Sequence, residues 1–356
     1  MEFGISFFPN VGPEDKSAQD YWDEALQLVD LCDPLGYTHV RTVEHYFKPY
    51  GGYTPSPIVF LAAASQRTKK ARLVTGAVLP AFNNPLKVAG EAGMLDAISD
   101  GRLDLGLARA FMPHEFERFG VSLDESRRRY DEGVDQINRL LSEENVTMEG
   151  EFHSFKNVTS LPRPTQQPSP PIWVAALQTP ETFEFAGRNG FHLMGNPIGG
   201  AKLRELVEVY REAWSSAGHP GHGKVALAFM MYCASSTEQA IEEAGPDVRA
   251  YFQTLTDAAS DWGTGTSSKD YPGYDKLIDV LSKEDVHTQR EKSAALIGSS
   301  DEICDMIADY SRQMGGFDIA SLQVNLKMLD IENAKISMKL FAEEVIPRFA
   351  TAPRAA

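Results

Sequence analysis

The segment Val40-Arg41-Thr42-Val43-Glu44-His45-Tyr46-Phe47 decides how the rest of the chain is interpreted. The apolar run at residues 37–43 is typical of a buried strand, and it ends on an acid, an imidazole and two aromatic rings. At the carboxyl end of a parallel strand, the backbone holds such side chains rigidly while the following loop leaves room for a ligand. Glu44 and His45 are therefore candidate functional residues, and the alternative is a capped strand end with a structural histidine.

Short apolar segments recur along the chain, and each is followed by a segment with helical periodicity. Because these βα units fill a chain of 356 residues, they predict one closed (β/α)8 TIM barrel with insertions, a single domain over residues 1–356. A doubly wound sheet is the alternative, but residues 8–13 after the first strand contain no glycine-rich phosphate loop. The eight expected strands begin near Phe3, His39, Leu73, Leu103, Ile172, His192, Val225 and Ile319.

Three segments interrupt this alternation of strands and helices. Residues 146–155 are expected to form a hairpin, and the proline-rich residues 161–171 to form an ordered crossing loop rather than a domain linker. Residues 257–292 lack a clear pattern, and a structureless loop of that length is usually functional. We expect this segment to be a mobile lid.

The composition excludes several classes of protein. The formal net charge of −16 argues against a nucleic-acid surface, which needs clustered Lys and Arg. The first residues contain neither a signal peptide nor a spanning helix, so no membrane association is expected. Cys32, Cys233 and Cys304 lie far apart and favour a reducing cytoplasm. His45, His114 and Glu115 are too scattered to predict a metal site.

Residues that follow two later strands predict an anion site. Arg109 leaves the fourth strand and needs an anion or a carboxylate as a partner. Thr179 and Thr182 begin the helix after the fifth strand, where free backbone amides and hydroxyl groups favour phosphate. The alternatives are that Arg109 pairs with Glu115 or Asp104, and that Thr179 only caps its helix.

Three small residues in the third strand, Thr75, Gly76 and Ala77, predict space at the barrel mouth for a flat ligand. A kink that serves packing is the alternative. Aromatic residues are expected near the same rim, so a planar cofactor is one interpretation of this space.

Over nearly its whole length, the chain resembles the bacterial luciferase-like monooxygenases, a flavin-dependent (β/α)8 family. No single segment carries the resemblance, but the order and spacing of several segments together are specific. The matching segments are Met1-Glu2-Phe3-Gly4, Glu44-His45-Tyr46-Phe47, Val78-Leu79-Pro80 with Asn84-Pro85, Leu95-Asp96-Ala97-Ile98-Ser99-Asp100-Gly101-Arg102, Gly106-Leu107-Ala108-Arg109 and Ser337-Met338-Lys339-Leu340-Phe341.

The resemblance implies reduced FMN, supplied by a separate flavin reductase, which reacts with O2 to give a flavin C4a-hydroperoxide. It implies phosphate contacts from Arg109, Thr179 and Thr182, with Gln178 at a position where luciferases carry an acid. It places a cis peptide bond next to the flavin ring at Thr75-Gly76 or Gly76-Ala77. His45 matches the catalytic histidine and Glu115 an acidic residue after the phosphate arginine, while Glu44 is expected to orient the His45 ring.

Three departures bear on the substrate. Light-emitting relatives carry a second histidine at the position of Tyr46, a reactive cysteine at Ala108 and a tyrosine at Met112. We therefore expect hydroxylation or epoxidation of a larger organic metabolite, aromatic or polyketide-like, rather than oxidation of a long-chain aldehyde with light emission. The alternatives are an oxidoreductase that uses the deazaflavin F420 for hydride transfer and a non-catalytic partner subunit. The resemblance also suggests a homodimer through helices near residues 57–67 and 85–99.

Overall fold

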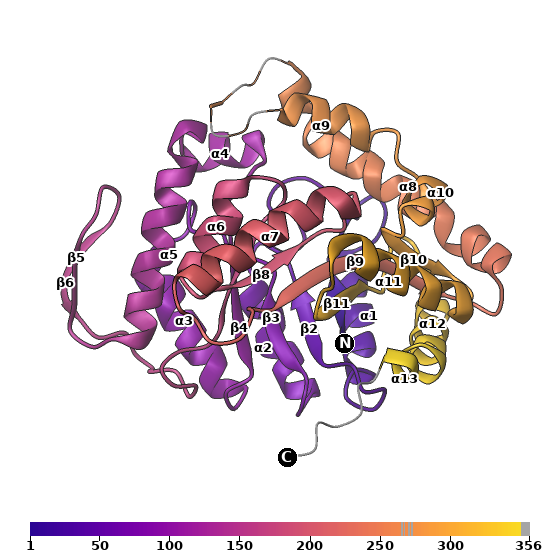
Figure 1. The fold of residues 1–356 in the computed structure, drawn as a ribbon, viewed down its shortest axis with the longest axis horizontal. Coiled ribbons are helices and arrows are strands. Elements are labelled where there is room, and N and C mark those ends of the chain that lie inside the picture. Colours follow the sequence, from indigo (N-terminus) through magenta and orange to yellow (C-terminus); the bar gives the residue numbers. More distant parts are fainter. Residues whose placement is uncertain (265, 267, 270, 272, 350–356) are drawn as a thin grey trace.

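Eight parallel strands form a closed barrel, in which β1 pairs with both β2 and β11 and β8 pairs with β9 (Figure 1). The computed structural model of the chain describes residues 1–264, 266, 268–269, 271 and 273–349. The predicted (β/α)8 fold is confirmed, and all eight predicted starting residues lie within observed strands. The barrel strands are β1 (Glu2–Phe7), β2 (His39–Thr42), β3 (Arg72–Thr75), β4 (Leu103–Ala108), β7 (Ile172–Ala175), β8 (His192–Gly195), β9 (Val225–Cys233) and β11 (Ile319–Gln323).

Helices surround the barrel on its outer side (Figure 1). The longer helices between and after the barrel strands are α1 (Ala18–Asp30), α2 (Pro57–Arg67), α3 (Pro85–Ile98), α5 (Ser126–Ser142), α6 (Pro180–Arg188), α7 (Gly200–Ser216), α8 (Thr237–Ala258), α11 (Ser300–Met314) and α12 (Ile331–Glu344). The shorter ones are α4 (Pro113–Phe119), α9 (Tyr274–Leu281), α10 (Val286–Glu291), α13 (Ile346–Phe349) and the 3-10 helices η1 (Leu123–Glu125) and η2 (Ser260–Thr264).

Local sequence signals explain where several helices begin and end. The Ser17 side chain accepts a hydrogen bond from the Asp20 amide at 3.0 Å and so caps α1. Asn84 caps α3 by accepting from the Leu86 amide at 2.9 Å, and Pro85 occupies the first helical turn, where its missing N–H costs nothing. Gly120 ends α4 with a φ of 66°, a left-handed conformation that suits glycine.

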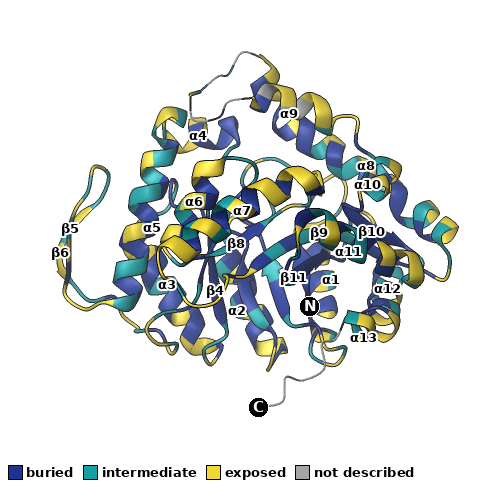
Figure 2. Cartoon of the chain, in the orientation of Figure 1, coloured by how far each residue is buried: buried dark blue, intermediate teal, exposed yellow. Residues whose placement is uncertain are grey.

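The hydrophobic core lies between the strands and the helices, and Figure 2 shows buried strands inside helices whose outer faces are exposed. In β1, Phe3, Ile5 and Phe7 are at most 2% exposed. Phe3 packs against Phe341 of α12 with ring centroids 5.4 Å apart. Strands covered on both faces are typical of parallel sheets, which explains their nearly continuous apolar sequences.

The segment at residues 257–292 is more regular than its sequence suggests. It contains the end of α8 as well as η2, α9 and α10, so the interpretation as a structureless loop is wrong for these parts. Residues 265, 267, 270 and 272 of this predicted lid lie outside the described residues. A further parallel strand, β10 (Ala295–Gly298), follows the segment and pairs with residues 230–233 of β9, and the sequence analysis missed it.

The two other interruptions match their predictions. A two-stranded antiparallel hairpin, β5 (Val146–Glu149) and β6 (Ser154–Val158), projects beside α5 (Figure 1). The proline-rich crossing is held in place, because Arg163 donates hydrogen bonds of 2.7 and 2.8 Å to the carbonyl groups of Leu140 and Leu141 in α5. Across the described part of the chain, every helix is too short or too polar to span a bilayer.

Candidate active site

The predicted site residues meet along one side of the barrel mouth. The strands β2, β3, β4 and β7 are consecutive neighbours in the sheet, so their carboxyl ends lie next to one another. Glu44 and His45 follow β2, residues 75–77 end and follow β3, Arg109 follows β4, and residues 178–182 follow β7. The barrel thus brings together segments that are far apart in the sequence.

His45 forms a buried pair with Glu115. The His45 Nδ1 atom lies 3.1 Å from Oε1 of Glu115, which also accepts a hydrogen bond from the Tyr46 amide at 2.9 Å. Glu115 is 1% exposed and lies in the first turn of α4, a helix that the sequence analysis did not predict. With Nδ1 engaged in this way, Nε2 is the ring atom left to exchange a proton with a ligand.

Glu44 does not orient His45, so that expectation is wrong. Its carboxylate accepts hydrogen bonds from the Tyr46 hydroxyl at 2.6 Å, the Asn83 side chain at 2.8 Å and the Leu79 amide at 3.2 Å. Burial raises the pKa of Glu44 to about 7, although these three donors oppose the rise. Glu44 therefore ties the segment after β3 to the segment after β2, and Glu115 takes the orienting role.

Aromatic rings enclose His45 on several sides. The centroid of its ring lies 5.2 Å from that of Tyr50, 5.5 Å from that of Phe8 and 6.0 Å from that of Phe111. A Cβ atom at Gly51 would clash with the His45 side chain, and Gly51 has a φ of 77°, so glycine is needed there on both counts. These contacts fix the ring and keep bulk water away from it.

The Arg109 guanidinium is surrounded by tyrosines rather than carboxylates. Its Cζ atom lies 4.3 Å from the ring centroid of Tyr271, a cation–π arrangement. Its Nη1 atom is buried and has no hydrogen-bond acceptor among the described residues. The alternative that Arg109 pairs with Glu115 or Asp104 is wrong, because Glu115 bonds to His45 and Asp104 to Arg72.

Helix α5 supplies polar groups that the sequence analysis missed. The hydroxyl groups of Ser126 and Tyr130, one helical turn apart, are buried and have no hydrogen-bond partner in the described part of the chain. Burial raises the pKa of Tyr130, Asp131 adds to this rise, and the guanidinium groups of Arg127 and Arg109 oppose it. In the sequence, Ser126 and Tyr130 look like ordinary helix residues, and only the fold brings Tyr130 within electrostatic reach of Arg109.

The segment between β7 and α6 has an open helix terminus. Thr179 occupies the N-cap position directly before Pro180, as the capping alternative predicts, although its side chain makes no capping hydrogen bond. Thr182 is 8% exposed, and its amide donates to the Thr179 carbonyl at 3.0 Å. Gln178 accepts a hydrogen bond from the Lys202 ammonium at 2.9 Å, so its amide oxygen is already engaged.

Space after β3 is smaller than the sequence suggests. The Thr75 hydroxyl donates to the Gly106 carbonyl and accepts from the Gly106 amide, so it is already engaged within the barrel. The peptide bond between Gly76 and Ala77 is cis, one of the two expected positions. A Cβ atom at Gly76 would overlap the Arg41 guanidinium, so a side chain of the same protein fills the predicted gap.

The predicted lid contacts the site. The Trp262 indole donates to the Phe111 carbonyl at 3.0 Å, and the Tyr271 hydroxyl donates to the Ala110 carbonyl. Both rings are 3% exposed. The loop that follows Arg109 is therefore covered by η2 and by the segment before α9.

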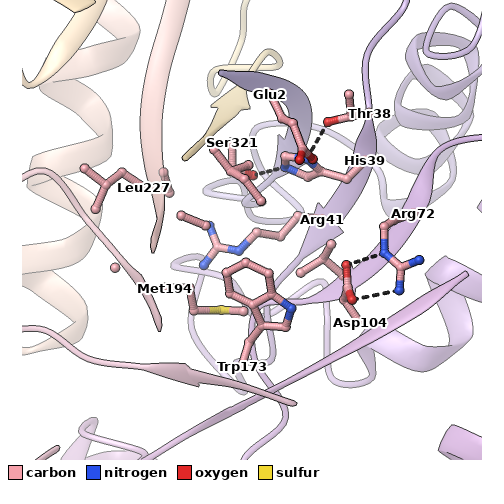
Figure 3. A pocket seen from close by; sticks show the side chains of 15 residues that line it. Glu2, Thr38, His39, Arg41, Arg72, Asp104, Trp173, Met194, Leu227 and Ser321 are labelled. Carbon is pink, nitrogen blue, oxygen red and sulfur yellow. Dashed lines mark hydrogen bonds and ion pairs between the residues drawn. The ribbon is translucent and has the colours of Figure 1, made fainter. Parts of the chain in front are cut away.

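A small cavity lies at the opposite end of the barrel (Figure 3). Glu2, His39 and Arg72, the first residues of three strands, line it together with Arg41 and Trp173. Its volume of about 30 Å³ suits a water molecule rather than a flavin. The site for a cofactor is therefore the mouth, and no group of three His, Cys, Asp or Glu side chains within the described residues is arranged to hold a metal.

Comparisons with known proteins identify the family of the chain. The family model for luciferase-like monooxygenases matches residues 1–316. The oxygenase component of a flavin-dependent trigonelline monooxygenase from Acinetobacter baylyi is 29% identical, and the match covers 98% of this chain and 96% of that protein.

Two solved structures share the fold over nearly the whole chain. The monooxygenase RslO1 from Streptomyces bottropensis is 41% identical with a TM-score of 0.88, over 98% of this chain and 100% of that one. The oxygenating constituent of 3,6-diketocamphane monooxygenase from Pseudomonas putida, solved with FMN, is 23% identical with a TM-score of 0.82, over 99% of both chains. At that identity, the second likeness concerns the fold alone.

Proposed function

The chain belongs to the luciferase-like monooxygenase family, and from that premise we propose that it is the oxygenase component of a two-component flavin monooxygenase. It would receive reduced FMN from a separate reductase and use O2 to hydroxylate or epoxidise an organic metabolite. The observation that carries this proposal is the meeting, at one barrel mouth, of the buried His45–Glu115 pair and the polar groups around Arg109.

The groups around Arg109 fit the phosphate of FMN. A phosphate oxygen would satisfy the buried Nη1 atom of Arg109, and the hydroxyl groups of Ser126 and Tyr130 have donors to offer. The amino end of α6, with the hydroxyl groups of Thr179 and Thr182, adds polar side chains and the positive end of a helix dipole. Buried donors without acceptors are costly in a protein, so their concentration here supports a bound anion.

His45 is the group best placed to handle a proton. When bound, reduced FMN would supply the electrons that activate O2. Glu115 fixes the ring through Nδ1, so Nε2 can donate or accept a proton while the ring keeps its orientation. Phe8, Tyr50 and Phe111 exclude water from this exchange.

The segment at residues 257–292 would act as a lid over the site. Contacts of Trp262 and Tyr271 with the loop after β4 support this role, because they close the mouth beside Arg109. A lid that opens for ligands and then excludes water protects a reactive intermediate.

Aromatic side chains at the rim support an aromatic or polyketide-like substrate. Phe47 is 54% and Phe119 39% exposed, and the Phe119 ring stacks on that of Phe82 at 4.6 Å. Tyr46 joins this cluster at 4.8 Å from Phe119, while its hydroxyl bonds to Glu44. Flat, exposed rings next to His45 would hold a flat apolar molecule.

Purified chain alone tests the proposed chemistry. Anaerobic titration with reduced FMN and with reduced F420 measures which cofactor binds, and mixing the complex with O2 then measures oxygen consumption by an electrode. Binding of reduced FMN followed by oxygen consumption faster than that of free reduced FMN is expected. Binding of F420 without oxygen use would instead favour hydride transfer, and binding of neither would favour a non-catalytic partner subunit.

Exposed apolar residues on α2 and α3 support a homodimer. Val59 of α2 is 72% exposed, and Met94 and Ile98 of α3 are 56% and 42% exposed. Adjacent helices with such residues on the surface form a patch that a second copy of the chain would cover. Met94→Lys should produce a monomer in light scattering after size exclusion, whereas Ile336→Lys on α12, 60% exposed, should not. A monomeric wild type would contradict the proposal.

A further inference from the structure

Arg41 directs a guanidinium group into the centre of the barrel, where the chain gives it little to bind. Its Nη2 atom donates to the Gly76 carbonyl at 3.0 Å, which is its single hydrogen bond among the described residues. Its Nε atom is buried and has no acceptor there. In the described part of the chain, no carboxylate lies within ion-pairing distance of Arg41.

The neighbours of Arg41 do not supply the missing negative charge. In Figure 3, Arg41 lies between the His39–Ser321 pair and the indole of Trp173. Asp104 lines the same cavity, but it holds Arg72 through two hydrogen bonds of 2.7 and 2.8 Å. Burial lowers the pKa of His39 to about 3, with a smaller contribution from Arg41, so this ring is neutral. The Trp173 Nε1 atom is itself a buried donor with no acceptor among the described residues.

An unpaired cation inside the barrel destabilises the folded protein. Burial lowers the pKa of Arg41 to about 10, which still leaves it charged at neutral pH. An unpaired charge inside a protein costs several kcal/mol, roughly, unless a partner compensates it. Because the described residues provide no such partner, a ligand is the expected source of the negative charge.

A hydrogen bond links Arg41 to the carboxyl end of β3, where the candidate active site lies. The Gly76 carbonyl that it binds directly follows β3, at the carboxyl end of the strand. Tyr251 of α8 lies close enough to affect the Arg41 charge, and its ring centroid is 5.5 Å from that of Phe8. The Phe8 ring centroid in turn lies 5.5 Å from that of His45, so neighbouring side chains connect the surroundings of Arg41 with those of His45.

Glycine at position 76 makes this arrangement possible. A Cβ atom there would overlap Nε of Arg41, so any larger residue would push the guanidinium away from the mouth. The pair of residues therefore places a cation directly under the backbone that borders the mouth.

We propose that Arg41 is an anion-binding residue of the active site and contacts a delocalised oxyanion of a bound ligand through its free N–H groups. The planar fork of an arginine suits such a group better than a point charge does. The oxyanion can belong to the reduced cofactor or to a carboxylate or enolate of the substrate. The inference rests on the proposed function only in placing these ligands at the mouth.

Two variants of Arg41 separate the contribution of its charge to binding from that of its planar guanidinium shape. Arg41→Met removes the charge and keeps much of the volume, and Arg41→Lys keeps the charge but loses the planar fork. Each is compared with wild type in anaerobic titrations with oxidised and reduced FMN, and in titrations with benzoate and its neutral analogue benzamide. Melting curves of the ligand-free proteins report on folding. Replacement of an unpaired cation by methionine is expected not to lower the melting temperature.

If the cofactor provides the anion, Arg41→Met should weaken binding of reduced FMN at least tenfold more than that of oxidised FMN. Each tenfold difference lowers the midpoint potential of bound FMN by about 30 mV. If the substrate provides it, the ratio of the two FMN affinities stays unchanged, while benzoate binding falls at least tenfold and benzamide binding does not. In either case Arg41→Lys should lose less of the wild-type binding preference than Arg41→Met, because it keeps the charge.

The proposal is overturned if Arg41→Met changes neither the ratio of FMN affinities nor the preference for benzoate over benzamide. A variant that melts at a lower temperature with both preferences intact would make Arg41 a structural residue. If wild type binds neither oxidised nor reduced FMN, the proposed function fails. The role of Arg41 is then still decided by the benzoate and benzamide titrations, in which thermal shift detects binding without flavin.

Discussion

Replacement of Glu44 by glutamine should make the stability of the protein less dependent on pH. Burial raises the pKa of this carboxyl from its ordinary 4.5 to about 7. The native state therefore holds a proton between pH 4.5 and 7 that the unfolded chain releases. The resulting contribution to stability is fully present below pH 4.5 and is lost as the pH rises through 7. A glutamine is neutral throughout, so it has no such loss.

The size of the effect follows from the two pKa values. A tenfold change in proton affinity corresponds to about 1.4 kcal/mol. Between pH 5 and 8, the wild type should therefore lose about 2 to 3 kcal/mol of unfolding free energy relative to Glu44→Gln. In Glu44→Gln, the side-chain amide nitrogen would also face a group that donates a hydrogen bond to Glu44, such as the Leu79 amide, so two donors would meet. That mismatch costs roughly 1–3 kcal/mol, but it is independent of pH and cancels in the comparison.

Urea unfolding at several pH values from 5 to 8.5 measures this difference. Glu205→Gln provides the control, because Glu205 is exposed on α7 and the same chemical change there should leave the pH dependence of wild type intact. The unfolding free energy of Glu44→Gln minus that of wild type should rise by about 2 to 3 kcal/mol from pH 5 to 8. A difference that stays constant across this range would refute the reasoning, because it would mean that Glu44 is ionised in the folded protein at pH 5.

Three further changes test the site. His45→Ala should leave FMN affinity within about threefold of wild type but reduce substrate oxygenation by about 100-fold or more, the usual contribution of a proton-transfer group; unchanged product formation would exclude His45. Arg109→Met should weaken FMN binding by about 10- to 100-fold through loss of charge-assisted hydrogen bonds. Fluorescence titration with riboflavin, which lacks the phosphate, should show little change, and an equal loss would contradict a phosphate contact. Gly76→Ala should lower the unfolding free energy by about 1–3 kcal/mol through overlap with Arg41; the double variant with Arg41→Ala should recover part of that loss in urea unfolding, and strict additivity would count against the overlap.

The barrel was accessible from the sequence because its strands are apolar on both faces and its helices carry clear boundary signals. β10 was missed because Ala295–Gly298 is short and follows a segment without a clear pattern. Its pairing with the far end of β9 depends on the unusual length of that strand, nine residues, which periodicity does not reveal. Helix α4 was missed because its seven residues lie directly after Arg109, where a loop was expected.

The site was predictable in its location but not in its pairings. Successive side chains of an extended segment point to opposite sides, so Glu44 and His45 cannot share one pocket although they are neighbours in the sequence. The partner of His45 comes instead from Glu115, which is 70 residues away and reaches it through the fold. Gly76 marks a close approach rather than free space for a ligand, because the Arg41 side chain of the adjacent strand occupies that position. Such contacts depend on side-chain direction in three dimensions, which one sequence does not contain.

The distribution of charge is compatible with the proposed binding of an anionic cofactor to an acidic protein. The chain carries a formal charge of −16, yet Arg109 and Arg41 form no ion pair within the described residues. Repulsion between surface carboxylates and a phosphate is largely screened beyond about 8 Å at physiological ionic strength. Cations enclosed by tyrosines or by the barrel are screened far less, because little water or salt reaches them. In the proposed oxygenase, recognition of the anion would therefore depend on a few enclosed guanidinium groups, and the acidic surface would not prevent binding.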